Sequence, residues 1–152
     1  MSTRGFTALG LVSPKCNANV GAALRAAACY SSDLIVLSGH RYRKQSTDTT
    51  KAWRHLPVLH NQADVFDAAP YGAVPVAVEL VPGAIELPDF VHPERAYYIF
   101  GPEDGSLGDK VITRCRYVVA VPTAYCMNLA ATINVVLYDR LTKRRRIQAR
   151  AA

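Results

Sequence analysis

Apolar residues near the C-terminus recur at intervals of three and four: Leu129, Ile133, Val136, Leu137 and Leu141. This spacing puts them on one face of a helix and predicts a helical segment with a single buried stripe. The helix is expected to begin at about Asn128, directly after Cys126 and Met127. The first turn of a helix has free backbone N–H groups, so a polar contact is expected at this end.

Short apolar runs bounded by Gly, Pro or polar residues predict buried strands in the rest of the chain. They lie at residues 6–12, 33–39, 73–80, 96–101 and 116–121. Helical segments are expected between them, at residues 19–31, 61–69 and 107–115. Strands that alternate with helices and are apolar throughout are typical of a sheet covered on both faces. The pattern therefore predicts an α/β fold, a mostly parallel sheet with helices on both faces, in a single domain over residues 1–152.

The composition favours a globular protein. Half of the 152 residues are hydrophobic and a fifth are charged. No apolar run approaches the ~20 residues that a membrane span needs, and the short run at the N-terminus fits a strand better than a signal peptide. We therefore expect a soluble cytoplasmic protein with no membrane partner. The four cysteines are scattered, which indicates buried, reduced thiols and no metal site.

The net charge of +6 is concentrated in two basic segments, residues 40–44 and 143–150. A clustered basic field attracts polyanions such as RNA and DNA. Residues from about 143 to 152 are expected to form a basic C-terminal tail, and a solvated surface with a frayed tail is the alternative. The polar segment 40–58 is too long for an idle connection in a compact domain, so it is a candidate for ligand contact.

Ligands of open α/β sheets bind beyond the carboxyl ends of the strands, where the segment "GPEDGSLG" at 101–108 is expected. Its three glycines allow tight turns and a close approach to a ligand. It matches no phosphate-binding fingerprint, and Glu103 and Asp104 would repel a phosphate, so a neutral or cationic ligand fits better. The alternative is a plain strand-to-helix turn in which Asp104 or Ser106 caps the next helix.

A second segment beyond a strand end is "NANVGAALR" at 17–25. Asn19 is a good helix N-cap, and Gly21 leaves open space beside Arg25 one turn later. A guanidinium suits a phosphate or a ribose oxygen, although a surface ion pair with a carboxylate is the alternative. The four histidines lie in different segments, so a hydrolytic Ser-His-Asp arrangement has no support.

Three segments, taken in order, resemble the signature motifs of the SpoU/TrmH family of RNA ribose 2′-O-methyltransferases in the SPOUT superfamily. They are "NANVGAALR", "YIFGPEDGSLGDKVI" and "CMNLAATINVVLYDR". The resemblance spans nearly the whole chain, and its length is similar to that of the minimal, TrmL-like members that consist of the catalytic domain alone.

The resemblance implies a C-terminal trefoil knot, which is otherwise close to absent from proteins. It also implies that the knotted loops bind S-adenosylmethionine, with S-adenosylhomocysteine as product. The partners would be RNA, either tRNA or rRNA, and a second copy of the chain in a homodimer formed through the C-terminal helix.

Site residues carry over by position in the motifs. The catalytic positions would be Asn19, Arg25, Glu103 and Asn128. The cofactor would contact residues in three loops: Val78, Glu79, Leu80, Phe100, Gly101, Glu103, Val121, Pro122, Cys126 and Met127. The chain departs from the family pattern at Cys126, where a Ser is usual, and the loop that begins at Pro122 is about three residues shorter.

The chemistry implied is methyl transfer to a ribose 2′-hydroxyl. An arginine is a poor base near neutrality, so we expect Arg25 of one subunit to stabilise the developing alkoxide in the pocket of the other. RNA contacts are expected from basic and aromatic residues of the polar segment: Arg41, Arg43, Lys44, Trp53 and Arg54. Two other functions stay open, a non-catalytic RNA-binding module that retains the knot and cofactor pocket, and an unknotted nucleotide-binding α/β protein.

Overall fold

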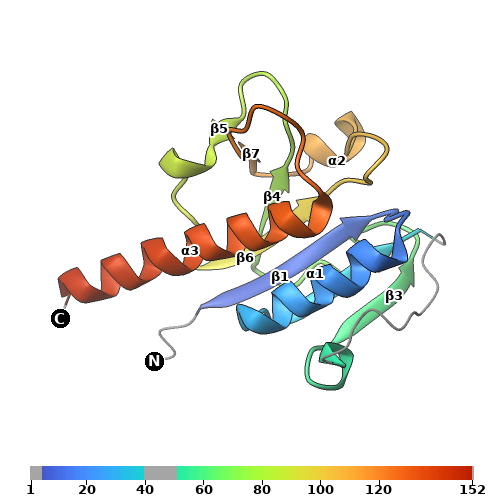
Figure 1. The fold of residues 1–152 in the computed structure, drawn as a ribbon, viewed down its shortest axis with the longest axis horizontal. Helices are drawn as coiled ribbons and strands as arrows, with labels where there is room; N and C mark the ends of the chain where they lie inside the picture. Colours follow the sequence, from blue (N-terminus) through green and yellow to red (C-terminus); the bar gives the residue numbers. More distant parts are fainter. Residues whose placement is uncertain (1–4, 40–50, 152) are drawn as a thin grey trace.

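The computed structural model describes residues 5–39 and 51–151, which form a seven-stranded sheet with helices against it (Figure 1). The elements follow along the chain as β1 (Phe6–Val12), α1 (Asn17–Cys29), β2 (Leu34–Ser38), the 3-10 turn η1 (Ala52–Arg54), β3 (Val58–Gln62), β4 (Val74–Val78), β5 (Ile85–Glu86), the 3-10 turn η2 (Leu87–Asp89), β6 (Arg95–Phe100), α2 (Asp109–Ile112), β7 (Tyr117–Ala120) and α3 (Leu129–Ala151).

The strands lie in the order β3-β2-β1-β6-β4-β7-β5, and every neighbouring pair is parallel. The parallel α/β sheet expected from the apolar runs is thereby confirmed. β7 lies between β4 and β5, which are consecutive in the chain, and Val119 of β7 pairs with Val78 on one side and Ile85 on the other. The connection from β4 to β5 therefore passes across the end of β7.

One face of the sheet is covered by α1 and α3, which pack against each other (Figure 1). Leu9 and Leu11 of β1 meet Leu24 of α1 and Ile133 and Leu137 of α3 in this layer. The alternation of side chains along β1 sends Ala8 to the other face. There it packs with Val65, Tyr97 and Leu107.

The second face carries less helix than the sequence indicated. Residues 61–69 do not form a helix, because the chain stays in β3 to Gln62 and then folds into turns. The side chain of Asp64 accepts a hydrogen bond from the backbone N–H of Phe66 at 2.8 Å, and that local bond competes with helical hydrogen bonding. The helix expected at 107–115 is reduced to the four residues of α2.

A buried arginine fixes α3 to the far end of the sheet. Arg140 is 4% exposed, and its guanidinium donates to the carbonyl oxygens of Phe6, Pro93 and Glu94 and to the hydroxyl of Tyr98, at 2.6 to 3.2 Å. The three carbonyl oxygens lie at or beside the starts of β1 and β6, and Tyr98 lies within β6, so the charge is satisfied by four oxygen atoms. α3 is therefore anchored at one end of the strands and begins at the other.

Within the described residues, none of the helices combines the length and the apolar character that a membrane crossing requires. The same residues contain no cluster of three or more His, Cys, Asp or Glu side chains with the arrangement of a metal site.

Candidate active site

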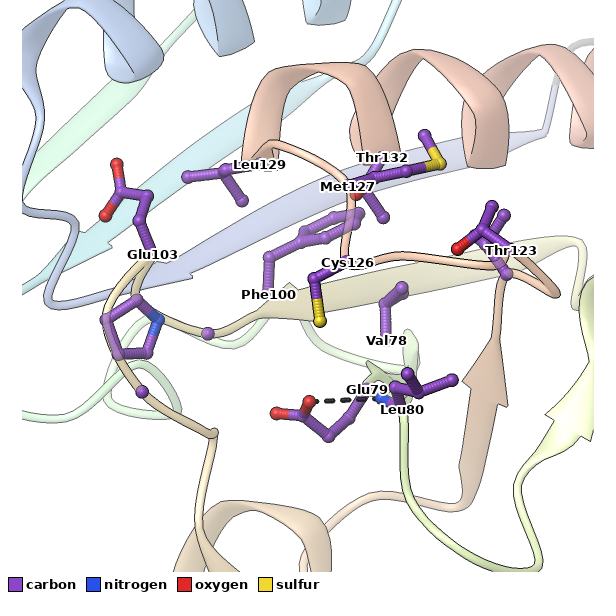
Figure 2. Close-up of a pocket in the computed structure, with 14 residues that line it drawn as sticks. Val78, Glu79, Leu80, Phe100, Glu103, Thr123, Cys126, Met127, Leu129 and Thr132 are labelled. Carbon is purple, nitrogen blue, oxygen red and sulfur yellow. Dashed lines mark hydrogen bonds between the residues drawn. The ribbon is translucent and has the colours of Figure 1, made fainter.

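A pocket opens beyond the carboxyl ends of β4, β6 and β7, beneath the first turn of α3 (Figure 2). The lining residues come from the loops after these strands and from α3: Val78, Glu79, Leu80, Phe100, Gly101, Pro102, Glu103, Gly105, Val121, Thr123, Cys126, Met127, Leu129 and Thr132. The position agrees with the rule that ligands of open α/β sheets bind outside the strand ends.

Nine of the ten residues expected to contact a cofactor line this pocket. The exception is Pro122, which is exposed between Val121 and Thr123. Five lining residues were not expected from the sequence: Pro102, Gly105, Thr123, Leu129 and Thr132. Of these, Leu129 and Thr132 could have been found, because the first turn of a helix that begins at a ligand loop faces the ligand.

The pocket has apolar walls and acidic edges. Val78, Phe100 and Leu129 contribute apolar surface, and the sulfur of Cys126 points into the space between them (Figure 2). Among the described residues that line it, Glu79 and Glu103 carry negative charge and none is Lys or Arg. This lining favours a ligand with an aromatic base and a positive charge over a phosphorylated nucleotide.

Glu79 holds two of the loops together. One carboxylate oxygen accepts hydrogen bonds from the Ser106 hydroxyl at 3.1 Å and from the Leu107 backbone N–H at 2.8 Å. The other accepts the backbone N–H of Leu80 at 3.1 Å, as the dashed line in Figure 2 marks. The loop after β4 is thereby tied to the loop after β6, which fixes the width of the pocket on that side.

Gly101 lets the loop after β6 fold back on itself. A Cβ atom at this position would lie 3.1 Å from the backbone nitrogen of Leu107, closer than side chains normally tolerate. A Cβ at Gly105 would meet only the ring of Pro102, at an ordinary contact distance of 3.6 Å. A side chain at position 101 would therefore be tightly packed against the loop, whereas position 105 has room for a methyl group.

The three motif residues Asn19, Glu103 and Asn128 form one hydrogen-bonded chain at the edge of the pocket. The amide of Asn128 donates to the side-chain oxygen of Asn19 at 2.7 Å. The amide of Asn19 in turn donates to Glu103 at 2.8 Å. The arrangement connects α1, the loop after β6 and the start of α3.

Glu103 also receives two backbone donors, the N–H groups of Lys15 at 2.8 Å and of Cys16 at 3.2 Å, just ahead of α1. Partial burial raises the pKa of Glu103, but the hydrogen bonds from Lys15, Asn19 and Cys16 outweigh it, so the net pKa lies below its ordinary value. The carboxylate therefore stays ionised and serves as an acceptor, not as a proton donor.

Asn128 caps α3. Its side-chain oxygen accepts the backbone N–H groups of Ala130 at 2.8 Å and of Ala131 at 3.3 Å, in the first turn of the helix. Asn19 is not a cap, because α1 begins at Asn17 and Asn19 lies inside its first turn. The capping roles considered for Asp104 and Ser106 are also wrong: Asp104 pairs with Lys15 at 3.0 Å, and α2 follows Gly108, which has a φ of 74° and no side-chain cap.

Arg25 does not line the pocket. It is exposed on α1 and makes no hydrogen bond or ion pair with any residue that the structure describes. It lies six residues beyond Asn19, which is about 9 Å along the helix. The structure of one chain therefore separates Arg25 from the other three motif residues.

The polar segment is described only in its last part. Trp53 is 43% exposed in η1, and the guanidinium carbon of Arg54 lies 5.4 Å from the centre of its ring. Ala52 and Leu56 are buried on either side and anchor this turn. The remaining expected RNA contacts, Arg41, Arg43 and Lys44, lie outside the described residues.

A family model described as the SpoU rRNA Methylase family matches residues 7–138 of the chain. No curated protein matches the chain. Solved structures with similar folds include the SpoU methyltransferase AviRb from Streptomyces viridochromogenes in complex with AdoMet, with a TM-score of 0.78 and 22% identity over 92% of this chain. The match covers 58% of that protein, so this chain spans less than two thirds of its length.

Two further structures extend the comparison. A structure described as giving insights into the 2-OH methylation of C/U34 on tRNA has a TM-score of 0.75 and 24% identity, over 91% of this chain and 90% of that one. A TrmH/SpoU tRNA modifying enzyme of A. aeolicus has a TM-score of 0.80 and 11% identity, over 96% of this chain and 81% of that one. At these identities the structural matches establish the fold, and the family model covers most of the chain.

Proposed function

The chain belongs to the SpoU rRNA methylase family, and from that membership we propose that it transfers a methyl group from S-adenosylmethionine to a ribose 2′-hydroxyl of tRNA or rRNA. The observation that carries the proposal is the pocket at the strand ends, whose edge is built by Asn19, Glu103 and Asn128 from all three motifs.

The lining of the pocket fits S-adenosylmethionine. Apolar walls from Val78, Phe100 and Leu129 suit an adenine ring. The two carboxylates that line the pocket favour a cationic sulfonium. When bound, the cofactor supplies an electrophilic methyl group, and S-adenosylhomocysteine is left after transfer.

The residues of this chain would act by orientation and electrostatics. The loops fixed by Glu79 and Glu103 hold the methyl donor, and alignment of the two reactants can contribute on the order of 7–11 kcal/mol to the barrier reduction. During transfer the 2′-hydroxyl would give up its proton to solvent, and a guanidinium beside it would stabilise the developing negative charge. Arg25 is our candidate for this group.

Because Arg25 is outside the pocket of its own chain, the proposal requires a homodimer in which it reaches the pocket of the partner. The outer face of α3 supports a subunit contact there, since Val135 is 38% exposed and Tyr138 is 58% exposed one turn apart. α1, which carries Arg25, packs directly beside α3. A dimer formed through α3 would therefore bring α1 close to the second subunit.

The proposal includes a trefoil knot in the C-terminal third of a single domain over residues 1–152. Its support is the position of β7 between β4 and β5, followed by the passage of residues 121–128 into α3. The Glu79 contacts tie the loop after β4 to the loop after β6.

For the RNA we propose contacts at Arg41, Arg43, Lys44, Trp53 and Arg54. The support is the exposed Trp53 ring beside Arg54, a pair that suits stacking on a base next to a phosphate. The similarity in length and fold to the structure described for methylation of C/U34 on tRNA makes tRNA the first substrate to test. An enzyme of tRNA or rRNA would work in the cytoplasm.

The deciding experiment combines cofactor binding with mapping of the product. Isothermal titration with S-adenosylhomocysteine measures the affinity of the protein for the cofactor product. Mass spectrometry of nucleosides after incubation with S-adenosylmethionine and total RNA detects 2′-O-methylation. Binding together with new 2′-O-methyl nucleosides is expected. Binding without methylation of any RNA would instead identify a non-catalytic RNA-binding module, and the absence of both would overturn the proposal.

A further inference from the structure

The last part of α3 is basic and lies beyond the layer that the helix covers. We call residues 143–151 the basic end of α3. The buried residues of the helix stop at Arg140, and residues 145–151 are exposed. In Figure 1 this part of the helix continues past the sheet to the C-terminus. From 141 to 152 the chain has five Lys and Arg residues and no Asp or Glu.

Two of these five side chains have structural contacts. Lys143 donates to the carbonyl oxygens of Leu87 and Phe90 and forms an ion pair with Asp139 at 2.7 Å. Arg144 is partly buried, and burial together with the charge of Arg140 lowers its pKa. These two residues help to hold α3 against the rest of the protein.

The other three, Arg145, Arg146 and Arg150, have no such contacts. They are exposed and make no hydrogen bond or ion pair with the described part of the chain. Like charges four positions apart, such as Arg146 and Arg150, repel each other, although the helix dipole favours cations at this end. An external polyanion would relieve the repulsion.

A groove beside the basic end offers a shaped contact. It runs between the end of α1 and α3, and its polar lining includes Tyr30, Ser31, Arg145 and Gln148. Hydroxyl, amide and guanidinium donors are the groups that bind phosphate oxygens, and the fork of an arginine does so with two hydrogen bonds. The chemistry of the groove and of the exposed arginines is therefore that of a surface for a phosphodiester backbone.

The position of this surface separates it from the pocket. Leu129 lines the pocket and Arg146 lies 17 residues further along the same helix, which corresponds to about 25 Å. One nucleotide cannot reach both, whereas a folded RNA spans the distance easily. We propose that the basic end of α3, through Arg145, Arg146 and Arg150, binds backbone phosphates of the RNA remote from the nucleotide that is modified. The inference rests on the proposed function, in which the substrate is RNA.

The salt dependence of RNA binding tests the proposal, because each phosphate that the protein neutralises steepens it. Binding of fluorescently labelled, unfractionated tRNA is measured between 50 and 300 mM KCl for the wild type and for Arg146→Gln/Arg150→Gln. Glutamine keeps the helix propensity and removes the charge. We expect the slope of log K against log salt to become shallower by roughly 0.7–0.9 for each phosphate that the variant no longer neutralises.

A matched variant, Lys110→Gln/Arg116→Gln, removes two exposed charges in and just after α2, away from the basic end. Its slope is expected to stay at the wild-type value. An unchanged slope in Arg146→Gln/Arg150→Gln, or equal changes in the two double variants, would overturn the inference. So would a change of oligomeric state in sedimentation of Arg146→Gln/Arg150→Gln, since that would make the basic end a subunit contact.

The proposed function has its own readouts, cofactor binding and methylation by the wild type. If the wild type methylates RNA and the slope does not respond to Arg146→Gln/Arg150→Gln, only the inference about α3 fails. If the wild type neither binds the cofactor nor methylates RNA, the proposed function fails whatever the slope.

Discussion

The side-chain amide of Asn128 donates a hydrogen bond to the side-chain oxygen of Asn19 at 2.7 Å, although 109 positions separate the two residues in the chain. The side-chain amide of Asn19 in turn donates a hydrogen bond to the carboxylate of Glu103 at 2.8 Å. Asn128 has a second task, because its oxygen caps α3. One asparagine therefore couples the start of the last helix to α1 and to the loop that borders the pocket.

The two tasks of Asn128 can be separated by substitution. Asn128→Ala removes the cap and the contact with Asn19, so we expect the free energy of unfolding to fall by about 1 kcal/mol and cofactor affinity to fall as well. Asn128→Asp keeps a capping oxygen but cannot donate to Asn19, so its cofactor affinity should fall with little change in stability. Chemical denaturation and titration with S-adenosylhomocysteine measure the two effects. Wild-type affinity in Asn128→Asp would show that the contact with Asn19 does not shape the pocket.

A methyl group at Gly101 should weaken cofactor binding. Its Cβ would lie 3.1 Å from the Leu107 nitrogen, so the loop would have to shift, and Leu107 is also the residue whose N–H binds Glu79. We expect Gly101→Ala to lower cofactor affinity about tenfold, which corresponds to roughly 1.4 kcal/mol. Gly105→Ala is the matched control in the same loop, because its Cβ has ordinary contacts at 3.6 Å. Equal affinities in the two variants would contradict this explanation of the glycine.

Stability at acidic pH should depend on His92. Its ring contacts the Tyr98 hydroxyl at 2.5 Å and the Asp139 carboxylate at 2.8 Å, and burial lowers its pKa from 6.5 to about 4, against the influence of Asp139. Between these values the unfolded chain binds a proton that the folded protein does not. The contribution of neutral His92 to the free energy of unfolding is complete above pH 6.5 and falls by roughly 3 kcal/mol as the pH is lowered to 4.

The measurement is urea denaturation at several pH values for the wild type and for His92→Gln. The variant will be less stable overall. The comparison therefore uses the slope of the free energy of unfolding against pH between pH 6.5 and 4, and not its absolute value. A flatter slope in His92→Gln is expected, and parallel curves would mean that His92 is protonated equally in both states.

The apolar pattern of the sequence predicted the central strands well and the edge strand β3 poorly, for a physical reason. Residues 6–12 and 96–101 are continuous apolar runs because both faces of β1 and β6 are covered. β3 was missed because it is an edge strand with polar residues such as His60 and Gln62, which resemble a loop. The turns after it are set by the side chain of Asp64, which helical periodicity does not reveal.

For the candidate site, resemblance to a family located the pocket residues, but it did not reveal how they are connected. The hydrogen bonds of Asn19 and Asn128 join residues far apart in the chain, and a pattern along the sequence contains no such pairing. Arg140 is a similar case. It lies close to a basic segment and is nevertheless buried, because four oxygen atoms in or just before the central strands β1 and β6 accept hydrogen bonds from its guanidinium.

Trp53 and Arg54 should affect RNA binding in different ways. Trp53→Ala removes a stacking surface, so we expect weaker binding, by about 1–3 kcal/mol for one base, with an unchanged salt dependence. Arg54→Gln removes a charge and should make the salt slope shallower by roughly 0.7–0.9. Tyr71→Ala is the control, since Tyr71 is an aromatic residue that is 99% exposed on another part of the surface. Fluorescence anisotropy with tRNA measures all three, and equally weakened binding in Tyr71→Ala would argue against a specific stack at Trp53.

Arg25 provides the sharpest test, because the structure of one chain leaves it outside the pocket that it is proposed to serve. Arg25→Ala should reduce methyl transfer by about 10²–10³-fold while S-adenosylhomocysteine binds as in the wild type, since the side chain would act on the developing charge. Near-normal turnover would remove Arg25 from the mechanism. Gly101→Val should also abolish methyl transfer, but by blocking cofactor binding while Arg25 stays intact.

Mixing these two variants decides whether Arg25 acts across a subunit boundary. In a mixed dimer, the chain with Arg25→Ala supplies a complete pocket and the chain with Gly101→Val supplies the missing guanidinium. If equal amounts exchange at random in a two-fold dimer, roughly a quarter of the wild-type sites are rebuilt, and activity should recover to about that level. If sedimentation and native mass spectrometry show mixed dimers without recovered activity, Arg25 does not complete the pocket of its partner, and the pocket of one chain must contain all the groups that methyl transfer needs.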